Sequence, residues 1–248
     1  MHRTLQRGCV KAVVAFVCAA IAVGIGFGDR IVNSEIVQHM LGRKTVIDRV
    51  AEYGSTARAR IKPMFDEAGV CYPPRSVVLL GLKRERVLCV YAAGPTGKYR
   101  FIHAYPFHAA SGLLGPKMKE GDRQVPEGVY SVEELNPNSR FHLALRVGYP
   151  NDFDQARAEA EGRTDLGGDI MIHGGASSVG CLAMGDRAAE DLFVLAAETG
   201  IENIKIVIAP VDFRRGERPT RLKYRPKWLP ELYADIRNAM EPLPISHE

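Results

Sequence analysis

The sequence predicts a mostly β protein, α+β overall, in which an antiparallel sheet is flanked by helices. Short runs of β-branched and aromatic residues recur through the middle of the chain and are separated by turns rich in glycine and proline. Few helical patterns stand between these runs, which favours antiparallel pairing. Apolar residues at helical spacing occur mainly toward the two ends, within 30–69 and 229–240.

The N-terminal part of the chain is predicted to be helical. Residues 30–69 carry apolar side chains near the helical period, with breaks around Gly42 and Gly54. A further helical segment is expected over Ala57–Ala68. The prolines that follow Tyr72 end any helix and begin the β-rich region.

The β-rich region begins with a predicted hairpin. Its strands, Ser76–Leu82 and Val87–Ala92, are joined by the charged turn Lys83–Arg86. A turn at this place sets Cys89 opposite Leu80. The remaining predicted strands are Tyr99–Phe107, Gly128–Leu135, Phe141–Val147, Ile170–His173 and Ile204–Val211.

Three helices are predicted in the second half of the chain. The acidic, alanine-rich segment Asp152–Gly168 is expected to be a helical insertion. Asp186 is the predicted N-cap of a helix through Ala188–Thr199, and Leu229–Met240 is the predicted C-terminal helix. The tail from Phe213 is rich in arginine and lysine, so we interpret it as a solvated basic face, with contact to anionic polymers as the alternative.

Length and composition indicate one core of ordinary domain size. The 248 residues are 46% hydrophobic and 25% charged, with a formal net charge of +4. This charge suits anionic surfaces, and solubility alone also accounts for it. No block of basic residues is interleaved with aromatics, so the sequence argues against nucleic-acid binding.

Residues 1–28 are predicted to be a signal peptide or an N-terminal anchor. Basic residues within 2–11 precede the apolar run Ala12–Phe27, which is shorter than the about 20 residues of a membrane-spanning helix. Cys18 lacks the small and aliphatic residues expected before a lipidated cysteine. We therefore expect export to the periplasm or cell envelope, with membrane contact only through this segment. A buried helix is the alternative.

Export would place the remaining cysteines in an oxidising compartment. Beyond the leader these are Cys71, Cys89 and Cys181, and an odd number leaves at least one free thiol in the monomer. The hairpin register argues against a bond between Cys71 and Cys89. Both are expected to be buried thiols, and their pairing stays open.

The candidate site is a histidine and a cysteine on either side of a glycine-rich loop. His173 follows a short apolar run, and Cys181 lies eight residues later. The intervening glycines, Gly174 and Gly180 among them, allow the chain to fold back so that the thiol faces the ring. Imidazole activates a thiol, and a helix beginning just after Cys181 would lower its pKa. The alternative is a buried cysteine beside a structural histidine.

The stretch from His173 to Cys181 resembles the signature of the L,D-transpeptidase catalytic (YkuD-type) domain family. Those enzymes rework peptidoglycan through a cysteine acyl-enzyme. Further segments resemble the family in the expected order, the third of them its YafK-like murein L,D-transpeptidase branch. These segments are Ala110–Lys117, Glu120–Tyr130, and Leu135–His142 together with Leu145–Asp152.

The chain also departs from the common family pattern. Val179 stands where many members have a second histidine, and Ala183 where they have an arginine that is thought to hold a substrate carboxylate. The spacing from His173 to Cys181 is also shorter. These departures fit the YafK-like branch, part of which is associated with hydrolysing the bond between peptidoglycan and an attached lipoprotein.

The resemblance implies an L,D-transpeptidase-like catalytic domain over 74–211. It would lie between a helical segment over 29–73 and a basic tail with a helix over 212–248. The implied activity is that of a peptidoglycan-active cysteine acyltransferase working on stem peptides in cell wall remodelling and cell shape. The alternative is a cysteine amidase that releases a protein or peptide, such as a lipoprotein, from peptidoglycan. A non-catalytic peptidoglycan-binding protein is a further alternative.

The implied mechanism uses Cys181 as nucleophile and His173 as general acid and base. The N–H groups of Gly180 and Cys181 are expected to hold the oxyanion, with Gly174 and Ser178 also in the substrate-binding set and the Gly174 carbonyl orienting the ring. No cofactor is expected, and His173 and Cys181 lack a second ligand pair for zinc.

Other polar residues are assigned lesser roles. His142 either lines the cleft or lies on a strand surface. The remaining candidates, His103, His108, Lys117 and Asp122, are expected to be structural, the last two shaping a turn.

Overall fold

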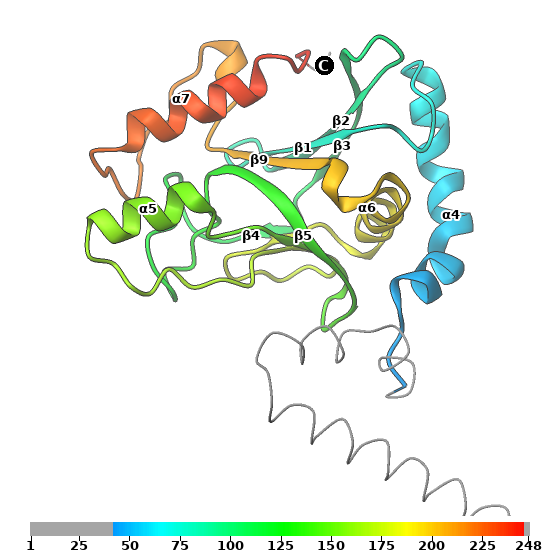
Figure 1. Ribbon diagram of the computed structural model, residues 1–248, viewed down its shortest axis with the longest axis horizontal. Coiled ribbons are helices and arrows are strands. Elements are labelled where there is room, and N and C mark those ends of the chain that lie inside the picture. The colour runs from blue at the N-terminus through cyan, green and yellow to red at the C-terminus, as the bar shows by residue number, and fades with distance from the viewer. Residues whose placement is uncertain (1–41, 246–248) are drawn as a thin grey trace, which may run out of the picture. The chain divides into compact units, whose positions relative to one another are not determined.

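The computed structural model describes residues 42–245 and contains one curled, mixed β-sheet with helices on both faces (Figure 1). Within this range the strand order is β3-β2-β1-β9-β5-β6-β7-β8-β4. The strands are β1 Val77–Leu82, β2 Val87–Ala93, β3 Tyr99–Pro106, β4 Ala109–Ala110, β5 Gly128–Ser139, β6 His142–Val147, β7 Met171–His173, β8 Leu182–Ala183 and β9 Ile204–Ala209. The helices are α4 Val46–Glu67, α5 Asp152–Ala160, α6 Asp186–Thr199 and α7 Leu229–Met240, with short 3₁₀ turns η1 Ile201–Asn203 and η2 Phe213–Arg215.

Strand β1 lies at the centre of the core. All of its residues are buried, because α6 and α7 lie on opposite sides of this part of the sheet (Figure 1). Val78 and Leu80 pack in one cluster with Leu232 and Ile236 of α7. The continuous apolar sequence of β1 is therefore that of a strand covered on both faces.

The predicted hairpin is confirmed, and its register is the predicted one. β1 and β2 pair antiparallel with Leu80 opposite Cys89. A charged turn between two apolar runs fixes this register, because a slip of one residue would turn the buried side chains to the opposite face.

The predicted architecture of a sheet flanked by helices is confirmed, and two of the eight strand pairings in the described region are parallel rather than antiparallel. These are β1 with β9 and β7 with β8. Parallel neighbours need a crossover connection, and the long sequence separation of β1 and β9 supplies one. The apolar runs that predict the strands do not show which of the strands pair in parallel.

The predicted helix break at Gly54 is wrong. Helix α4 is continuous from Val46 to Glu67, with Gly54 buried. The missing side chain leaves room for the guanidinium of Arg58, which reaches Glu198 of α6 at 2.8 Å. Gly54 therefore allows the Arg58 side chain to approach the helix backbone closely, and it does not interrupt the helix.

Two helix boundaries also differ from expectation. Within the predicted insertion Asp152–Gly168, the helix ends at Ala160 and a loop leads on to β7. The N-cap of α6 is Gly185, not Asp186, whose carboxylate instead accepts a hydrogen bond from the N–H of Gly175 at 2.7 Å.

The C-terminal helix α7 is confirmed over Leu229–Met240, while the basic tail is only partly solvated. Arg214 is paired with Asp212 at 2.7 Å and donates to the hydroxyl of Tyr91. Most of the other basic residues of the tail are exposed.

The predicted leader over 1–28 lies outside the described residues. Within 42–245, no helix is long and apolar enough to cross a membrane. The three cysteines in this range are all free thiols. Cys89 is buried, which raises its pKa to about 11, but Cys71 is exposed, so the expectation that it is buried is wrong.

Candidate active site

The two candidate residues lie on neighbouring strands. His173 is the last residue of β7, and Cys181 directly precedes β8. β7 and β8 are parallel, with His173 opposite Ala183. Cys181 lies in the bend before β8, and its Sγ contacts backbone groups of Met171 and Asp169 at the start of the neighbouring strand.

The ring of His173 is held by the backbone and covered by an aromatic side chain. Its Nδ1 lies 2.6 Å from the carbonyl oxygen of Gly174, the contact expected from the sequence. A ring N–H that donates to this carbonyl leaves Nε2 as the basic nitrogen. The ring of Phe141 stacks on His173 with centroids 4.7 Å apart. His173 is 1% exposed, and this burial lowers its pKa.

Phe141 was missed by the sequence reasoning. The sequence predicts it as the first residue of a strand and includes it in a segment that resembles the family, whereas in the structure it precedes β6 and is 45% exposed while it covers His173. An aromatic residue beside polar turn residues is the signal in the sequence, and it does not reveal which ring the side chain contacts.

The thiol of Cys181 is held by backbone groups. The N–H of Met171 donates to Sγ at 3.4 Å, and Sγ lies 3.5 Å from the carbonyl oxygen of Asp169. Within 42–245, no hydrogen bond joins this thiol to the ring of His173. Catalytic hydrogen bonds often form only when substrate binds, so this geometry does not by itself exclude a catalytic pair.

The expectation that Cys181 stands at a helix start, with a lowered pKa, is wrong. Strand β8 and the two residues after it separate Cys181 from α6, which begins at Asp186. Burial raises the pKa of the Cys181 thiol. The helix dipole acts mainly within the first turn, so it does not activate this thiol.

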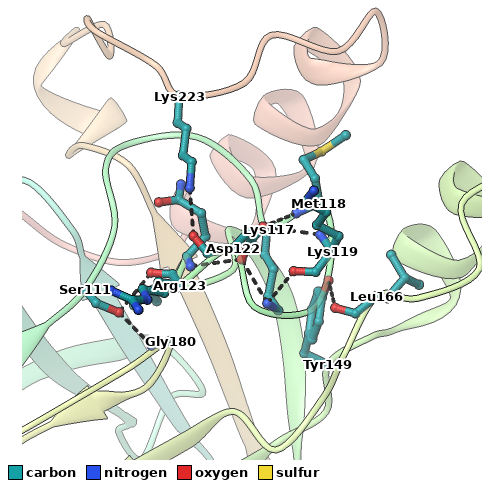
Figure 2. Close-up of polar contacts among 12 residues, drawn as sticks. Ser111, Lys117, Met118, Lys119, Asp122, Arg123, Tyr149, Leu166, Gly180 and Lys223 are labelled. Atoms are coloured by element: carbon teal, nitrogen blue, oxygen red, sulfur yellow. Dashed lines mark hydrogen bonds and ion pairs between the residues drawn. The ribbon is translucent and has the colours of Figure 1, made fainter.

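The backbone donors predicted for the oxyanion are all engaged. The N–H of Gly180 donates to Ser111 Oγ at 2.6 Å, as Figure 2 shows, and the N–H of Cys181 donates to Ser178 Oγ at 3.0 Å. The N–H of Gly174 donates to the carbonyl oxygen of Leu143 at 3.1 Å. A substrate oxyanion would have to replace a serine hydroxyl to use either of the first two donors.

Loop 111–127 borders the site and is fixed by two buried ion pairs. Lys117 Nζ lies 2.9 Å from Asp122 Oδ1 (Figure 2), and Lys83 Nζ lies 2.9 Å from Glu127 Oε1. Asp122 also accepts backbone N–H bonds from its own turn, so Lys117 and Asp122 shape a turn as expected. The loop contacts the residue before Cys181 through the hydrogen bond between Ser111 and Gly180.

Three other histidines, His103, His108 and His142, lie in the part of the chain that the structure describes. His142 Nε2 is 3.2 Å from Glu190 Oε1 of α6. His103 and His108 line a separate pocket of about 350 Å³ beside Asp186, at the start of α6. In the part of the chain that the structure describes, no group of three or more His, Cys, Asp or Glu residues is arranged to hold a metal ion.

Replacing Gly174 with alanine is expected to disturb the site. The new Cβ would lie 2.6 Å from Asp186 Oδ1 and 2.7 Å from the carbonyl oxygen of Phe141. Overpacking of this kind costs about 1–3 kcal/mol, and it would shift the carbonyl that orients His173. Thermal unfolding should show a lower Tm than for Gly168→Ala, a control whose Cβ meets nothing within 4 Å. Equal Tm values for the two variants would contradict the close approach of Asp186 and Phe141 to Gly174.

Comparison with known proteins identifies the class. The family model YkuD, L,D-transpeptidase catalytic domain, matches residues 75–208. "Putative L,D-transpeptidase YafK" of Escherichia coli (strain K12) is 38% identical over 113 residues, which cover 45% of this chain and 43% of YafK. The chain thus matches less than half the length of this relative. A protein of Escherichia coli O157:H7 with the same name matches this chain with the same identity and coverage.

Similar solved structures include those of two bacterial proteins. The helical cell shape determining protein Pgp2 from Campylobacter jejuni is 21% identical, with a TM-score of 0.45 over 68% of this chain and 57% of Pgp2. Bd1075 of Bdellovibrio bacteriovorus is 22% identical, with a TM-score of 0.41 over 68% of this chain and 55% of Bd1075. The family match covers more than half of the chain. The chain belongs to the L,D-transpeptidase catalytic domain family.

Proposed function

We propose that this protein is a cysteine acyltransferase that acts on the stem peptides of peptidoglycan. The observation that carries the proposal is the pair of adjacent parallel strands. His173, with its Nδ1 bound to the Gly174 carbonyl, ends the first of these strands, and Cys181 directly precedes the second. Membership of the L,D-transpeptidase family supports peptidoglycan as the substrate.

In the proposed first step, the thiol proton of Cys181 passes to Nε2 of His173. The thiolate then attacks a peptide carbonyl carbon and forms a tetrahedral intermediate. The C–N bond breaks as His173 returns the proton to the leaving amine, and a thioester remains on Cys181. Burial keeps His173 neutral at neutral pH, because it lowers the pKa, so the ring is ready to accept the proton.

An amine or water then resolves the thioester. An amine acceptor must be bound closely enough to compete with water, which requires a second occupied subsite. Val179 is 72% exposed and Ala183 is fully buried, so neither position offers a charged or hydrogen-bonding side chain to an acceptor. This favours hydrolysis as a substantial outcome, with release of a peptide or protein attached to peptidoglycan.

Export is part of the proposal. Peptidoglycan lies outside the cytoplasmic membrane, and the basic and apolar pattern of residues 1–28 is typical of a signal peptide or anchor. We propose the periplasm or cell envelope as the place of action.

Purified sacculi test the proposed function. Incubation with the wild-type protein should release peptide or protein fragments or form new L,D-cross-links, and mass spectrometry of the muropeptides distinguishes these products. Cys181→Ala should abolish both, while Cys71→Ser, a change at an exposed thiol, should leave them unchanged. Activity that survives in Cys181→Ala would overturn the assignment of the nucleophile. New cross-links without released fragments would overturn the hydrolytic outcome.

A further inference from the structure

The phenyl ring of Phe141 lies between the imidazole ring of His173 and the solvent. The two rings are stacked, with their centroids 4.7 Å apart and an angle of 30° between their planes. His173 is 1% exposed, whereas Phe141 is 45% exposed. A side chain that is itself half exposed therefore forms the cover that separates this face of the imidazole from water.

The position of Phe141 is fixed by the turn that joins β5 to β6. Ser139 and His142 pair across this turn, and the N–H of Phe141 donates to Ser139 Oγ at 3.1 Å. His142 has a φ of 73°, in the left-handed region that a residue with a Cβ seldom adopts. The carbonyl oxygen of Phe141 lies close to Gly174, since a Cβ on Gly174 would be 2.7 Å from it. The turn thus keeps Phe141 against the residue whose carbonyl binds the His173 ring.

Two helices hold this turn. His142 Nε2 lies 3.2 Å from Glu190 Oε1 of α6, and the His142 ring meets the Tyr53 ring of α4 edge to face, with centroids 5.0 Å apart. Glu190 also pairs with Arg60 of α4 at 2.8 Å. The neighbour of Phe141 is therefore anchored, which fixes the backbone from which the phenyl ring extends over the imidazole.

A single hydrogen bond does not fix an imidazole ring. The bond from Nδ1 to the Gly174 carbonyl, at 2.6 Å, holds one edge of the His173 ring. The second side-chain torsion of histidine has broad energy wells, so this bond alone leaves the ring free to tilt. A second ring stacked on its face restricts the tilt. Together the two contacts define where Nε2 points.

The cover that Phe141 provides favours the neutral form of the ring. Burial lowers the pKa of His173, and the bond to the Gly174 carbonyl opposes this effect. Protonation would place a positive charge where little water reaches it. The neutral ring is the form that accepts a proton from a thiol, so the cover favours the form that the proposed reaction needs.

Titratable side chains approach this end of β7 from three neighbouring elements. They are His142 and Arg146 of β6, Cys181 before β8, and Asp186 and Glu190 of α6. Each of the charged ones is bound to a partner: Arg146 to Asp169, Glu190 to Arg60, and Asp186 to the N–H of Gly175. Exclusion of water is therefore the influence on His173 that a change at Phe141 would alter.

We propose that Phe141 is a positioning residue, whose phenyl ring holds the imidazole of His173 in one orientation and keeps water away from it. This inference rests on the proposed function, in which Nε2 of His173 takes the thiol proton. A ring held at one edge and on one face presents Nε2 in one place, as proton transfer to a positioned base requires. Phe141 acts through His173 and takes no part in the bond changes.

Titration of the ring by NMR tests the exclusion of water. The Cε1–H signal of His173 is identified by its absence from the spectrum of His173→Ala, and its chemical shift is followed against pH. In Phe141→Ala the pKa of His173 should rise by about half a unit to one unit, because water then reaches the protonated ring. Phe141→Tyr keeps a stacked ring and should keep the wild-type value. His103, which lines the separate pocket, is the internal control.

Turnover of sacculi tests the orientation of the ring. Phe141→Ala should lower turnover at neutral pH about tenfold, and the acid limb of its pH profile should move to higher pH together with the pKa of His173. Phe141→Tyr should retain the wild-type turnover and profile. The matched control is Ile245→Ala, which truncates a large hydrophobic side chain of similar exposure, 43%, and should leave turnover and titration unchanged.

A second variant protects the test against misfolding. Phe141→Gln keeps the length of the side chain but brings polar atoms and their water to the imidazole, so it should also raise the pKa of His173. Unchanged titration of His173, or unchanged turnover, in either variant would overturn the inference when circular dichroism shows that the variant is folded. The titration needs no peptidoglycan. Failure of the proposed function would be revealed separately, by sacculus activity that survives Cys181→Ala or His173→Ala.

Discussion

His173→Ala should lower the turnover of sacculi by about 10²–10⁴-fold, the usual contribution of a positioned general acid and base. The reason is geometric. The ring of His173 is fixed by a backbone carbonyl at 2.6 Å, and His173 ends the strand that pairs with the one following Cys181. Without it, the thiol proton has no base to accept it, and burial keeps the thiol neutral by raising its pKa.

The pH profile adds a second expectation for the wild type. Burial lowers the pKa of His173, so the neutral ring persists below the ordinary titration range of histidine. Activity should therefore be lost on the acid side only as the pH falls through this lowered value. The matched control is His108→Ala, since His108 is exposed and lines the separate pocket at the start of α6. Equal turnover in the two variants would remove His173 from the mechanism.

Glu127→Ala should destabilise the protein by about 3–5 kcal/mol, because it leaves a buried ammonium without its partner. The side chains of Glu127 and Lys83 are 0% and 6% exposed, and their charged atoms are 2.9 Å apart. Glu127 also accepts hydrogen bonds from the N–H of Gly115 at 2.6 Å and from the hydroxyl of Tyr233 at 2.9 Å. The substitution therefore removes contacts that join Glu127 to the loop at Gly115, to the turn after β1 at Lys83, and to α7 at Tyr233.

Urea unfolding followed by circular dichroism measures this effect. The control is Glu134→Ala, whose side chain is 57% exposed and lies 3.6 Å from Arg146, a pair expected to contribute less than about 1 kcal/mol. Burial lowers the pKa of Lys83, and without Glu127 the neutral amine is favoured further. The unfolded state then binds the proton more tightly than the folded state, so the stability of Glu127→Ala should rise with pH. Similar unfolding midpoints for the two variants would contradict the role of this pair.

The ion pairs Lys83–Glu127 and Lys117–Asp122 explain how the glycine-rich loop beside the candidate site is held in place. Loop 111–127 has little apolar material of its own, yet Glu127 anchors one end to the core and Asp122 fixes the turn in its middle. The N–H of Gly180 donates a hydrogen bond to Ser111, and this bond holds the residue before Cys181 against the fixed loop. A preorganised loop of this kind avoids the cost of ordering during the reaction.

Features that depend on neighbours along the chain were predictable. The register of Leu80 with Cys89 follows from a short turn between two apolar runs, and α7 follows from helical spacing after Trp228. The contact between His173 and the Gly174 carbonyl joins adjacent residues, and the resemblance to the family already implied it.

Features that depend on contacts between segments far apart in the sequence were not predictable from the sequence. Phe141 stacks on His173, and Arg58 fills the space above Gly54 to reach Glu198, because the packing of separate elements brings these residues together. No local pattern shows such contacts. The parallel pairing of β1 with β9 is of the same kind.

The sequence by itself determined the longer strands, the main helices and the two residues proposed for the chemistry, because periodicity, turn residues and motif spacing are local properties. The two-residue strands β4 and β8 were not predicted. The tertiary structure alone decided the electrostatics of the site. It left Cys181 half-buried and away from a helix start, and it bound the N–H groups expected to hold the oxyanion to serine hydroxyls. Burial and charge at a point in space depend on every segment packed around it, and a single stretch of sequence does not contain them.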